Sequence, residues 1–117
     1  DLPPLQVCLQ VNISGEASKS GASPAELPAL ARAVAALPRL RLRGLMAIPA
    51  PAEGLQAQRE PHRALRELLE RLRAEGLALD TLSMGMSDDL EAAVLEGATI
   101  VRIGTAIFGH RAPKAAG

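Results

Sequence analysis

Arg102 is the residue whose setting most strongly suggests chemistry. It stands within Ile100-Val101-Arg102-Ile103, the most apolar of the predicted strands. A guanidinium in such a strand must be paired or must face a ligand, because an unpaired buried charge is very costly. The sequence leaves two interpretations equal. One is a salt bridge or an arginine that reaches out to solvent, and the other is a donor directed at a ligand atom or anion.

Two glycine-containing segments follow predicted strands and suggest a ligand site. Gly104-Thr105 comes directly after the strand of Arg102, and residues 84–87 (Met-Gly-Met-Ser) end the strand before it. Glycine at a strand end lets backbone N–H groups come close to a phosphate, and the Thr105 hydroxyl adds a donor. An ordinary turn is the structural alternative. Together, two such ends and one arginine are typical of the phosphate site formed by the last two strands of a barrel.

Ser87 is followed by two aspartates, Asp88 and Asp89, in a pattern that predicts a short helix running to Glu96 and closed by Gly97. Helix capping is a sufficient role for Ser87, although a helix N-terminus also attracts anions. The aspartates suit the helix dipole but would repel a phosphate. Both must therefore point away from the site if it exists.

The other reactive side chains carry weaker signals. Lys19 lies in a loop rich in serine and glycine, where a solvated lysine is the simplest interpretation. His62 and His110 belong to no cluster with metal-ligand spacing, so we predict no metal site. Cys8 stands in the middle of a strand without an evident base, which predicts a buried, unreactive thiol.

Four strands are predicted. Strict alternation of apolar and polar residues over 5–13 is typical of a strand, and short apolar segments predict strands over 42–48, 79–84 and 99–103.

Helices are predicted between these strands. Ser23 and Glu26 form a capping box for a helix that ends at Pro38. The next helix is expected to start near Pro61, as a first-turn proline, and to end at Gly76. The charged face of this helix is interpreted as exposed to solvent, with ion pairs between residues four positions apart.

The alternation of strands and helices predicts a parallel sheet with right-handed crossovers. A small open sheet and half of a (β/α) barrel both fit. The polar face of the first strand favours the barrel, because an open parallel sheet is apolar on both faces. Residues 1–109 are therefore expected to form a half-barrel that lacks its N-terminal half, with 110–117 as a tail.

The composition limits the function classes. The chain has 117 residues, 48% of them hydrophobic, and a formal net charge of +0. This neutrality argues against nucleic-acid and membrane-surface roles. A single cysteine excludes an internal disulfide framework and suggests a reducing compartment, so we expect a cytoplasmic protein.

The motifs, taken in order, closely resemble the pyridoxal phosphate homeostasis protein family (the YggS family), whose fold is like the N-terminal barrel of alanine racemase. The resemblance runs from about Leu2 to Gly109. It is carried by these segments: Asn12-Ile13-Ser14, Ser18-Lys19-Ser20-Gly21, Leu42-Arg43-Gly44-Leu45-Met46-Ala47-Ile48-Pro49, Leu82-Ser83-Met84-Gly85-Met86-Ser87-Asp88-Asp89 and Val101-Arg102-Ile103-Gly104-Thr105-Ala106-Ile107-Phe108-Gly109.

The resemblance implies the C-terminal half of a (β/α)8 TIM-type barrel, with four parallel strands, that binds pyridoxal 5′-phosphate (PLP). The family's Schiff-base lysine is expected in the missing N-terminal half, and Lys19 matches a family loop lysine that forms an accessory site at most. By position, the cofactor-binding residues would be Ser87, Gly104 and Thr105 at the phosphate, Arg102 at the pyridine nitrogen, and Met84 and Met86 near the ring.

The expected role is to bind, buffer and deliver PLP within the cell, with PLP-dependent apo-enzymes as possible partners. No catalytic residue is assigned, because an arginine cannot give a proton to the ring nitrogen and the ring is then a poorer electron sink. Two alternatives stay open. One is a PLP-dependent amino-acid racemase of the same barrel type, and the other is a barrel that binds a different phosphate ester.

Overall fold

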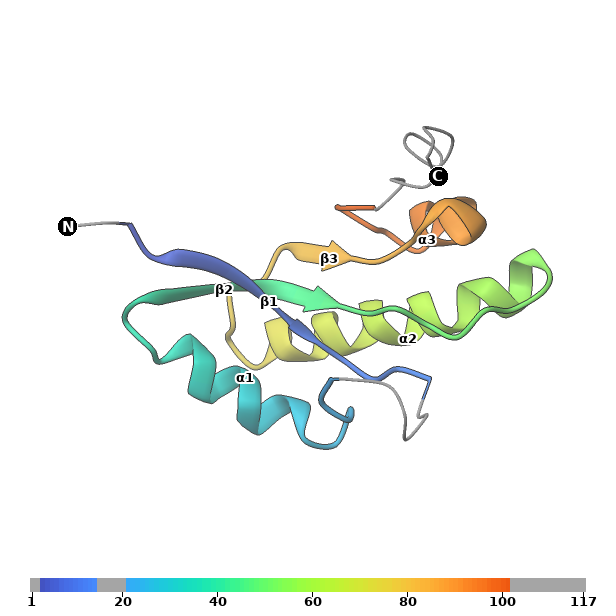
Figure 1. Cartoon of the computed structure of the whole chain (residues 1–117). Helices are drawn as coiled ribbons and strands as arrows, with labels where there is room; N and C mark the ends of the chain where they lie inside the picture. The colour runs from blue at the N-terminus through green and yellow to red at the C-terminus, as the bar shows by residue number, and fades with distance from the viewer. Residues whose placement is uncertain (1–2, 15–20, 102–117) are drawn as a thin grey trace.

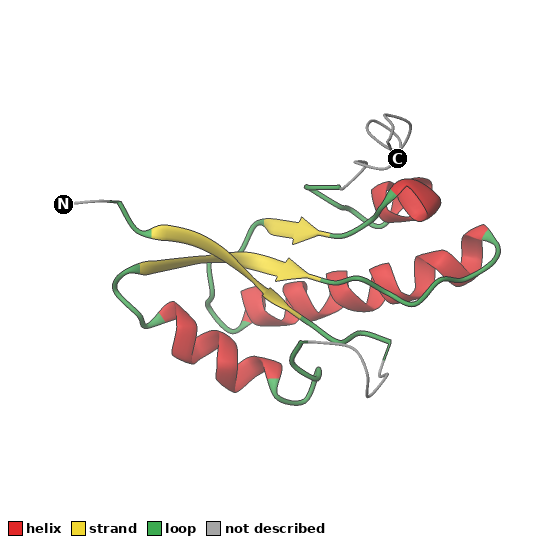
Figure 2. Ribbon diagram, in the orientation of Figure 1, coloured by secondary structure: helices red, strands yellow, loops and turns green. Residues whose placement is uncertain are grey.

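The chain forms a three-stranded parallel sheet with helical crossovers. The computed structural model describes residues 3–14 and 21–101, apart from the side chain of Ser87. The strands β1 (Leu5–Gln10), β2 (Leu40–Met46) and β3 (Thr81–Ser83) are neighbours in that order. The helix α1 (Leu27–Ala35) connects β1 to β2, and α2 (Leu55–Ala74) connects β2 to β3 (Figure 1). Both helices run along the same side of the sheet (Figure 2). The predicted parallel α/β arrangement is thus confirmed.

The fourth predicted strand is not confirmed. Within the described residues, the segment over 99–103 contributes a single parallel bridge, between Ser83 and Ile100. Residues 102 and 103 lie outside the described part of the chain. Between β3 and this bridge, a 3-10 turn, η1 (Ser87–Asp89), leads directly into the helix α3 (Leu90–Leu95), which matches the predicted short helix.

The hydrophobic core lies between the sheet and the helices. Leucines spaced three and four residues apart on α2 form one apolar stripe, as helical periodicity requires. This stripe packs with buried leucines of the strands. The buried set includes Leu27, Leu42, Leu45, Leu65, Leu68, Leu69, Leu72 and Leu82. Each fully buried leucine contributes about 2 kcal/mol through removal of apolar surface from water.

A bulge in β2 sets which residues face the core. Val7 pairs with Leu42, but Cys8 pairs with Gly44, so Arg43 is an extra residue. The extra residue shifts the alternation, and both Leu42 and Leu45 are buried although they are three positions apart. Gly44 lies so close to β3 that an added Cβ would stand 1.8 Å from the carbonyl oxygen of Thr81. No larger residue fits there without movement of the backbone.

The predicted capping box is confirmed. The Ser23 N–H donates to Glu26 Oε1 at 3.0 Å, and the Glu26 N–H donates to Ser23 Oγ at 3.2 Å. This turn leads into α1, whose first residue is Leu27.

The start predicted for the second helix was wrong. α2 begins at Leu55, so Pro61 lies inside it rather than in its first turn. Gly54, with φ +90°, lets the chain turn into the helix earlier. The cost of an interior proline is the hydrogen bond that its missing N–H would make to the carbonyl of Ala57.

The predicted glycine stop is confirmed. Gly76 has φ +105°. Its N–H donates to the carbonyl of Arg73, and the Leu77 N–H donates to the carbonyl of Leu72. These two bonds form a Schellman motif, which satisfies the last carbonyls of α2. Among the described residues, no helix combines the length and the apolar character that crossing a membrane requires.

Candidate functional site

A cleft of about 220 Å³ lies where β2 and β3 end. The carboxyl ends of parallel strands are the usual place for ligands in α/β folds. One wall is the segment 47–52 after β2, a second is the start of α2, and a third is the loop after β3. The lining residues are Ala47, Ile48, Pro49, Ala50, Pro51, Ala52, Gln58, Pro61, Gly85, Met86, Asp88 and Asp89. This lining is mostly apolar, with carboxylates on one side.

The loop after β3 has a conformation that its glycine permits. Gly85 has φ +100°, and an added Cβ would stand 2.5 Å from the Cβ of Ala93 on α3. The loop can therefore lie directly against α3 only with glycine at this position. The two methionines on either side differ. Met84 is fully buried in the core, whereas Met86 is 42% exposed and lines the cleft.

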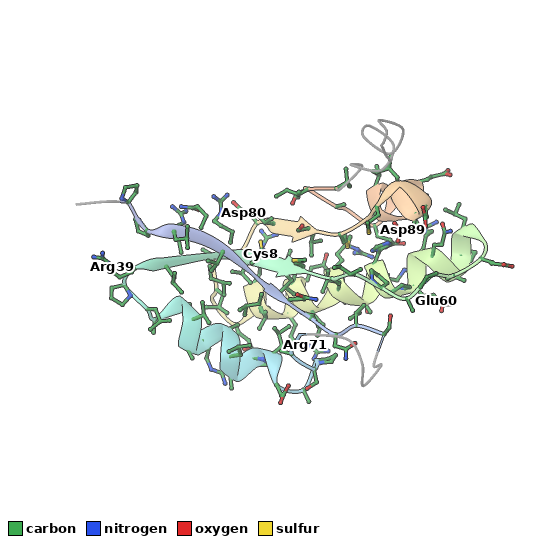
Figure 3. All side chains as sticks on the ribbon, in the orientation of Figure 1. Cys8, Arg39, Glu60, Arg71, Asp80 and Asp89 are labelled. Carbon is green, nitrogen blue, oxygen red and sulfur yellow. The ribbon has the colours of Figure 1, made fainter. Side chains whose placement is uncertain are left out.

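Asp89 joins this loop to α2. Its Oδ1 accepts the backbone N–H of Met86 at 2.8 Å, and its Oδ2 lies 2.9 Å from Nε2 of His62. His62 is fully buried, and its Nδ1 has no hydrogen-bond partner within the described part of the chain. Figure 3 labels Asp89, beside α3 and above α2. Both oxygens of this carboxylate are thus occupied by groups of the protein itself.

A phosphate site at this loop requires both aspartates to point away from it, and the two differ in this respect. Asp89 is held by His62 and by the Met86 amide. Asp88 is exposed and lines the cleft. Asp88 therefore does not meet the requirement that both carboxylates point away from a phosphate, whereas both oxygens of Asp89 are engaged by groups of the protein.

The predicted site residues are only partly within the described structure. The backbone of Ser87 begins η1, with Met86 at the N-cap position. The amide of Met86 is satisfied by Asp89, which sequence reasoning had not assigned as a cap. Arg102, Gly104 and Thr105 lie outside the described residues, as does Lys19. Among the residues described, no group of three potential metal ligands comes together.

The face of α2 predicted to be solvated is exposed at Glu67, Glu70, Arg71 and Arg73, and the prediction was wrong only for Arg66, which contacts a buried carboxylate. Glu96, just after α3, is 2% exposed and lies against this face. Arg59 Nε is 2.8 Å from Oε2 of Glu96, Arg63 Nη2 is 3.3 Å from the same oxygen, and Arg66 Nη2 is 3.1 Å from Oε1. Burial alone would raise the pKa of Glu96, but hydrogen bonds from the three arginines outweigh it and lower the pKa to about 2. The expected i,i+4 pair, Arg66 with Glu70 at 3.3 Å, is also present.

A second polar cluster crosses the sheet near the amino end of β3. Arg43 donates to both carboxylate oxygens of Asp80, at 3.0 and 2.7 Å, and to Gln6 Oε1 at 2.8 Å. The Arg43 hydrogen bonds are the largest of the effects that lower the pKa of Asp80 to about 2. Cys8, labelled with Asp80 in Figure 3, is half-buried, and this burial raises the pKa of its thiol. The thiol is thus less buried than the sequence predicted, and its lack of reactivity stays a prediction.

Comparison with known proteins identifies the class of fold. The family model described as "Alanine racemase, N-terminal domain" matches residues 1–112. A solved structure of an unknown protein from Bifidobacterium adolescentis is similar, with TM-score 0.84 and 41% identity, over 91% of this chain and 44% of that chain. PipY of Synechococcus elongatus, solved with PLP bound, has TM-score 0.73 and 31% identity, over 86% of this chain and 47% of its own. The chain therefore belongs to the alanine racemase N-terminal domain family.

Two curated relatives specify the kind of protein within this family that the chain resembles. A pyridoxal phosphate homeostasis protein of Pseudomonas aeruginosa is 69% identical over 110 residues, which are 94% of this chain and 46% of that protein. The protein of the same name from Escherichia coli K12 is 59% identical over 111 residues, 95% of this chain and 47% of that protein. The resemblance to the pyridoxal phosphate homeostasis proteins is thus confirmed. The chain spans about half the length of these relatives.

Proposed function

We propose that this chain forms part of a PLP-binding protein of intracellular PLP homeostasis, which binds, buffers and delivers the cofactor. The observation that carries the proposal is the 69% identity, over 94% of the chain, to a pyridoxal phosphate homeostasis protein. The PLP bound in the PipY structure, which is similar over 86% of this chain, supports the same ligand.

The proposed binding residues are Ser87, Gly104 and Thr105 at the phosphate, Arg102 at the pyridine nitrogen, and Met84 and Met86 near the ring. Three features of the described residues support this assignment. Met86 lines the cleft, Gly85 lies in the cleft lining and lets the loop lie against α3, and the Asp89 carboxylate is bound by His62 and the Met86 amide. Met84 is fully buried in the core and is not among the residues that line the cleft, so the structure adds no support for its place near the ring.

The residues of the chain favour binding over catalysis. PLP, when bound, supplies an aldehyde that reacts with primary amines. The Arg102 guanidinium stays charged and would donate a hydrogen bond to the ring nitrogen without giving up its proton. The ring then withdraws electrons poorly, so proton removal from a bound amino compound is not promoted. The other proposed contacts would hold the phosphate through hydroxyl and backbone donors.

The wider setting is part of the same proposal. We propose that the sheet belongs to a (β/α)8 barrel in which this chain supplies four parallel strands. A half-barrel that this chain lacks would provide the lysine that binds the aldehyde. PLP-dependent apo-enzymes of the cytoplasm are the proposed acceptors of the cofactor.

Binding measurements on the product of the complete gene test this function. PLP is titrated into the protein and followed by its absorbance, with pyridoxal, which lacks the phosphate, as a matched ligand. Thr105→Val keeps the side-chain shape but removes the hydroxyl, and Arg102→Leu removes the ring-nitrogen donor. Each lost hydrogen bond to a charged group is expected to weaken PLP binding about tenfold. Wild-type protein that fails to bind PLP would refute the proposal.

An activity measurement separates the binding role from the alternative enzyme. The PLP-loaded protein is incubated with alanine and other amino acids, and the formation of the opposite enantiomer is followed. We expect no turnover at the rate of an ordinary enzyme, about 1 per second or faster. Racemisation at such a rate would replace the homeostasis role with a racemase.

A further inference from the structure

We propose that His62 is a positioning residue for the phosphate-binding part of the site, acting through Asp89 on the loop that carries Met86 and Ser87. This inference rests on the proposed PLP-binding function. Its basis is one continuous connection from α2 to the loop: His62 Nε2 lies 2.9 Å from Asp89 Oδ2, and Asp89 Oδ1 accepts the Met86 N–H at 2.8 Å.

The burial of His62 shows that this connection is not an incidental surface contact. Its side chain is 0% exposed, and Nδ1 has no partner among the described residues, which leaves Nε2 as the nitrogen that makes a hydrogen bond. Burial of a polar group with one atom unsatisfied is unfavourable. A leucine would fill the same position in the apolar stripe of α2 without that cost. The imidazole of His62 therefore has a role beyond packing, because a leucine would pack at this position without an unsatisfied polar atom.

The connection acts at the position where the cofactor phosphate is proposed to bind. Met86 directly precedes Ser87, and its amide is fixed by the same carboxylate that His62 holds. With His62 present, Asp89 is turned toward α2. Without it, the carboxylate is free to rotate, the Met86 amide loses its fixed acceptor, and a negative charge can approach the phosphate. The loss of His62 should therefore weaken the binding of a phosphate ester more than the binding of its dephosphorylated form.

The test compares PLP with pyridoxal on the product of the complete gene. His62→Leu removes the imidazole and keeps an apolar side chain, whereas His62→Gln places an amide N–H close to the position of Nε2. Leu65→Ala is the matched control, because Leu65 is equally buried on α2 but has no polar atom that could hold the Asp89 carboxylate. Dissociation constants are measured by absorbance, and the melting temperature of each variant is recorded without ligand.

We expect His62→Leu to weaken PLP binding about tenfold while pyridoxal binding changes less than twofold, because the Asp89 charge that His62 holds can then approach the phosphate, which pyridoxal lacks. His62→Gln should restore most of the PLP affinity. Leu65→Ala should lower the melting temperature and leave the ratio of the PLP and pyridoxal dissociation constants unchanged. An unchanged ratio in His62→Leu, or an equal loss for both ligands, would overturn the inference.

Asp89→Ala provides a second test. It removes the carboxylate that His62 holds, so no negative charge is left to approach the phosphate, and adding His62→Leu in this background should leave the ratio of the PLP and pyridoxal dissociation constants unchanged. If both variants fold, the double variant should bind PLP no more weakly than Asp89→Ala alone, because the two residues act in one chain. Additive losses would contradict the connection. Absence of PLP binding by the wild-type protein would instead refute the proposed function.

Discussion

Glu96 provides a direct test of how α3 is held against α2. In Glu96→Gln the side chain keeps its size but loses its charge, while Arg59, Arg63 and Arg66 keep theirs. The fall of the Glu96 pKa from 4.5 to about 2 corresponds to about 3 kcal/mol, at 1.36 kcal/mol per pKa unit. The arginines are between 27 and 44% exposed, so solvent screening reduces this figure. We expect Glu96→Gln to lower the free energy of unfolding by about 2 kcal/mol at pH 7.

The pH dependence of the same variant separates charge from packing. A carboxyl group with a lowered folded-state pKa stabilises the fold above its unfolded pKa, and this stabilisation is lost as the pH falls through the folded-state value. The difference between wild type and Glu96→Gln in urea unfolding should therefore be constant above pH 5 and shrink from about pH 4.5 toward pH 2. Glu70→Gln is the matched control, because Glu70 is 56% exposed and contacts Arg66 alone among the described arginines, so its cost should stay below about 0.5 kcal/mol. Equal effects of the two substitutions, or a difference that does not change with pH, would refute the reasoning.

Three further predictions concern the sheet and the helix ends. Gly44→Ala should lower the free energy of unfolding by about 3 kcal/mol or more in urea unfolding, because the added Cβ meets the backbone of Thr81; a loss below 1 kcal/mol would contradict this. Gly76→Ala should cost only about 1 kcal/mol, since φ is +105° but the space around it is open; a loss as large as that of Gly44→Ala would be inconsistent with this account. The Asp80 carboxyl should titrate near pH 2 in NMR spectra, and a midpoint near 3.8 would show that Arg43 does not hold it.

Local signals in the sequence predicted local structure well. The reciprocal bonds of Ser23 and Glu26 follow from residues three apart, and the helix stop at Gly76 follows from one residue that tolerates a positive φ. Such features depend on a few neighbouring residues, so a single sequence contains them. The start of α2 was predicted too late because Pro61 suits the first turn of a helix, whereas the structure begins the helix directly after Gly54, which has a positive φ.

The contacts that join distant segments were not predictable in the same way. His62 was considered only as a metal ligand, and its actual partner lies 27 residues further along the chain. Glu96 gave no signal at all, because its arginines are 30 to 37 residues away and the same residue types on a helix usually face solvent. Charge alone does not reveal whether a face is covered by a later element. The family resemblance rested instead on short motifs, several of them at predicted strand ends.

The measurement that tests the central claim most directly is the location of bound PLP. This chain, and separately the product of the complete gene, are incubated with PLP and reduced with borohydride, and the modified lysine is identified by mass spectrometry. We predict stoichiometric labelling of one lysine outside residues 1–117 in the complete product, and no saturable labelling of Lys19 or Lys114 in this chain alone. Saturable labelling of Lys19 in this chain would contradict the proposed division between a phosphate-binding half and a lysine-bearing half. No specific labelling of either protein would contradict the account as a whole.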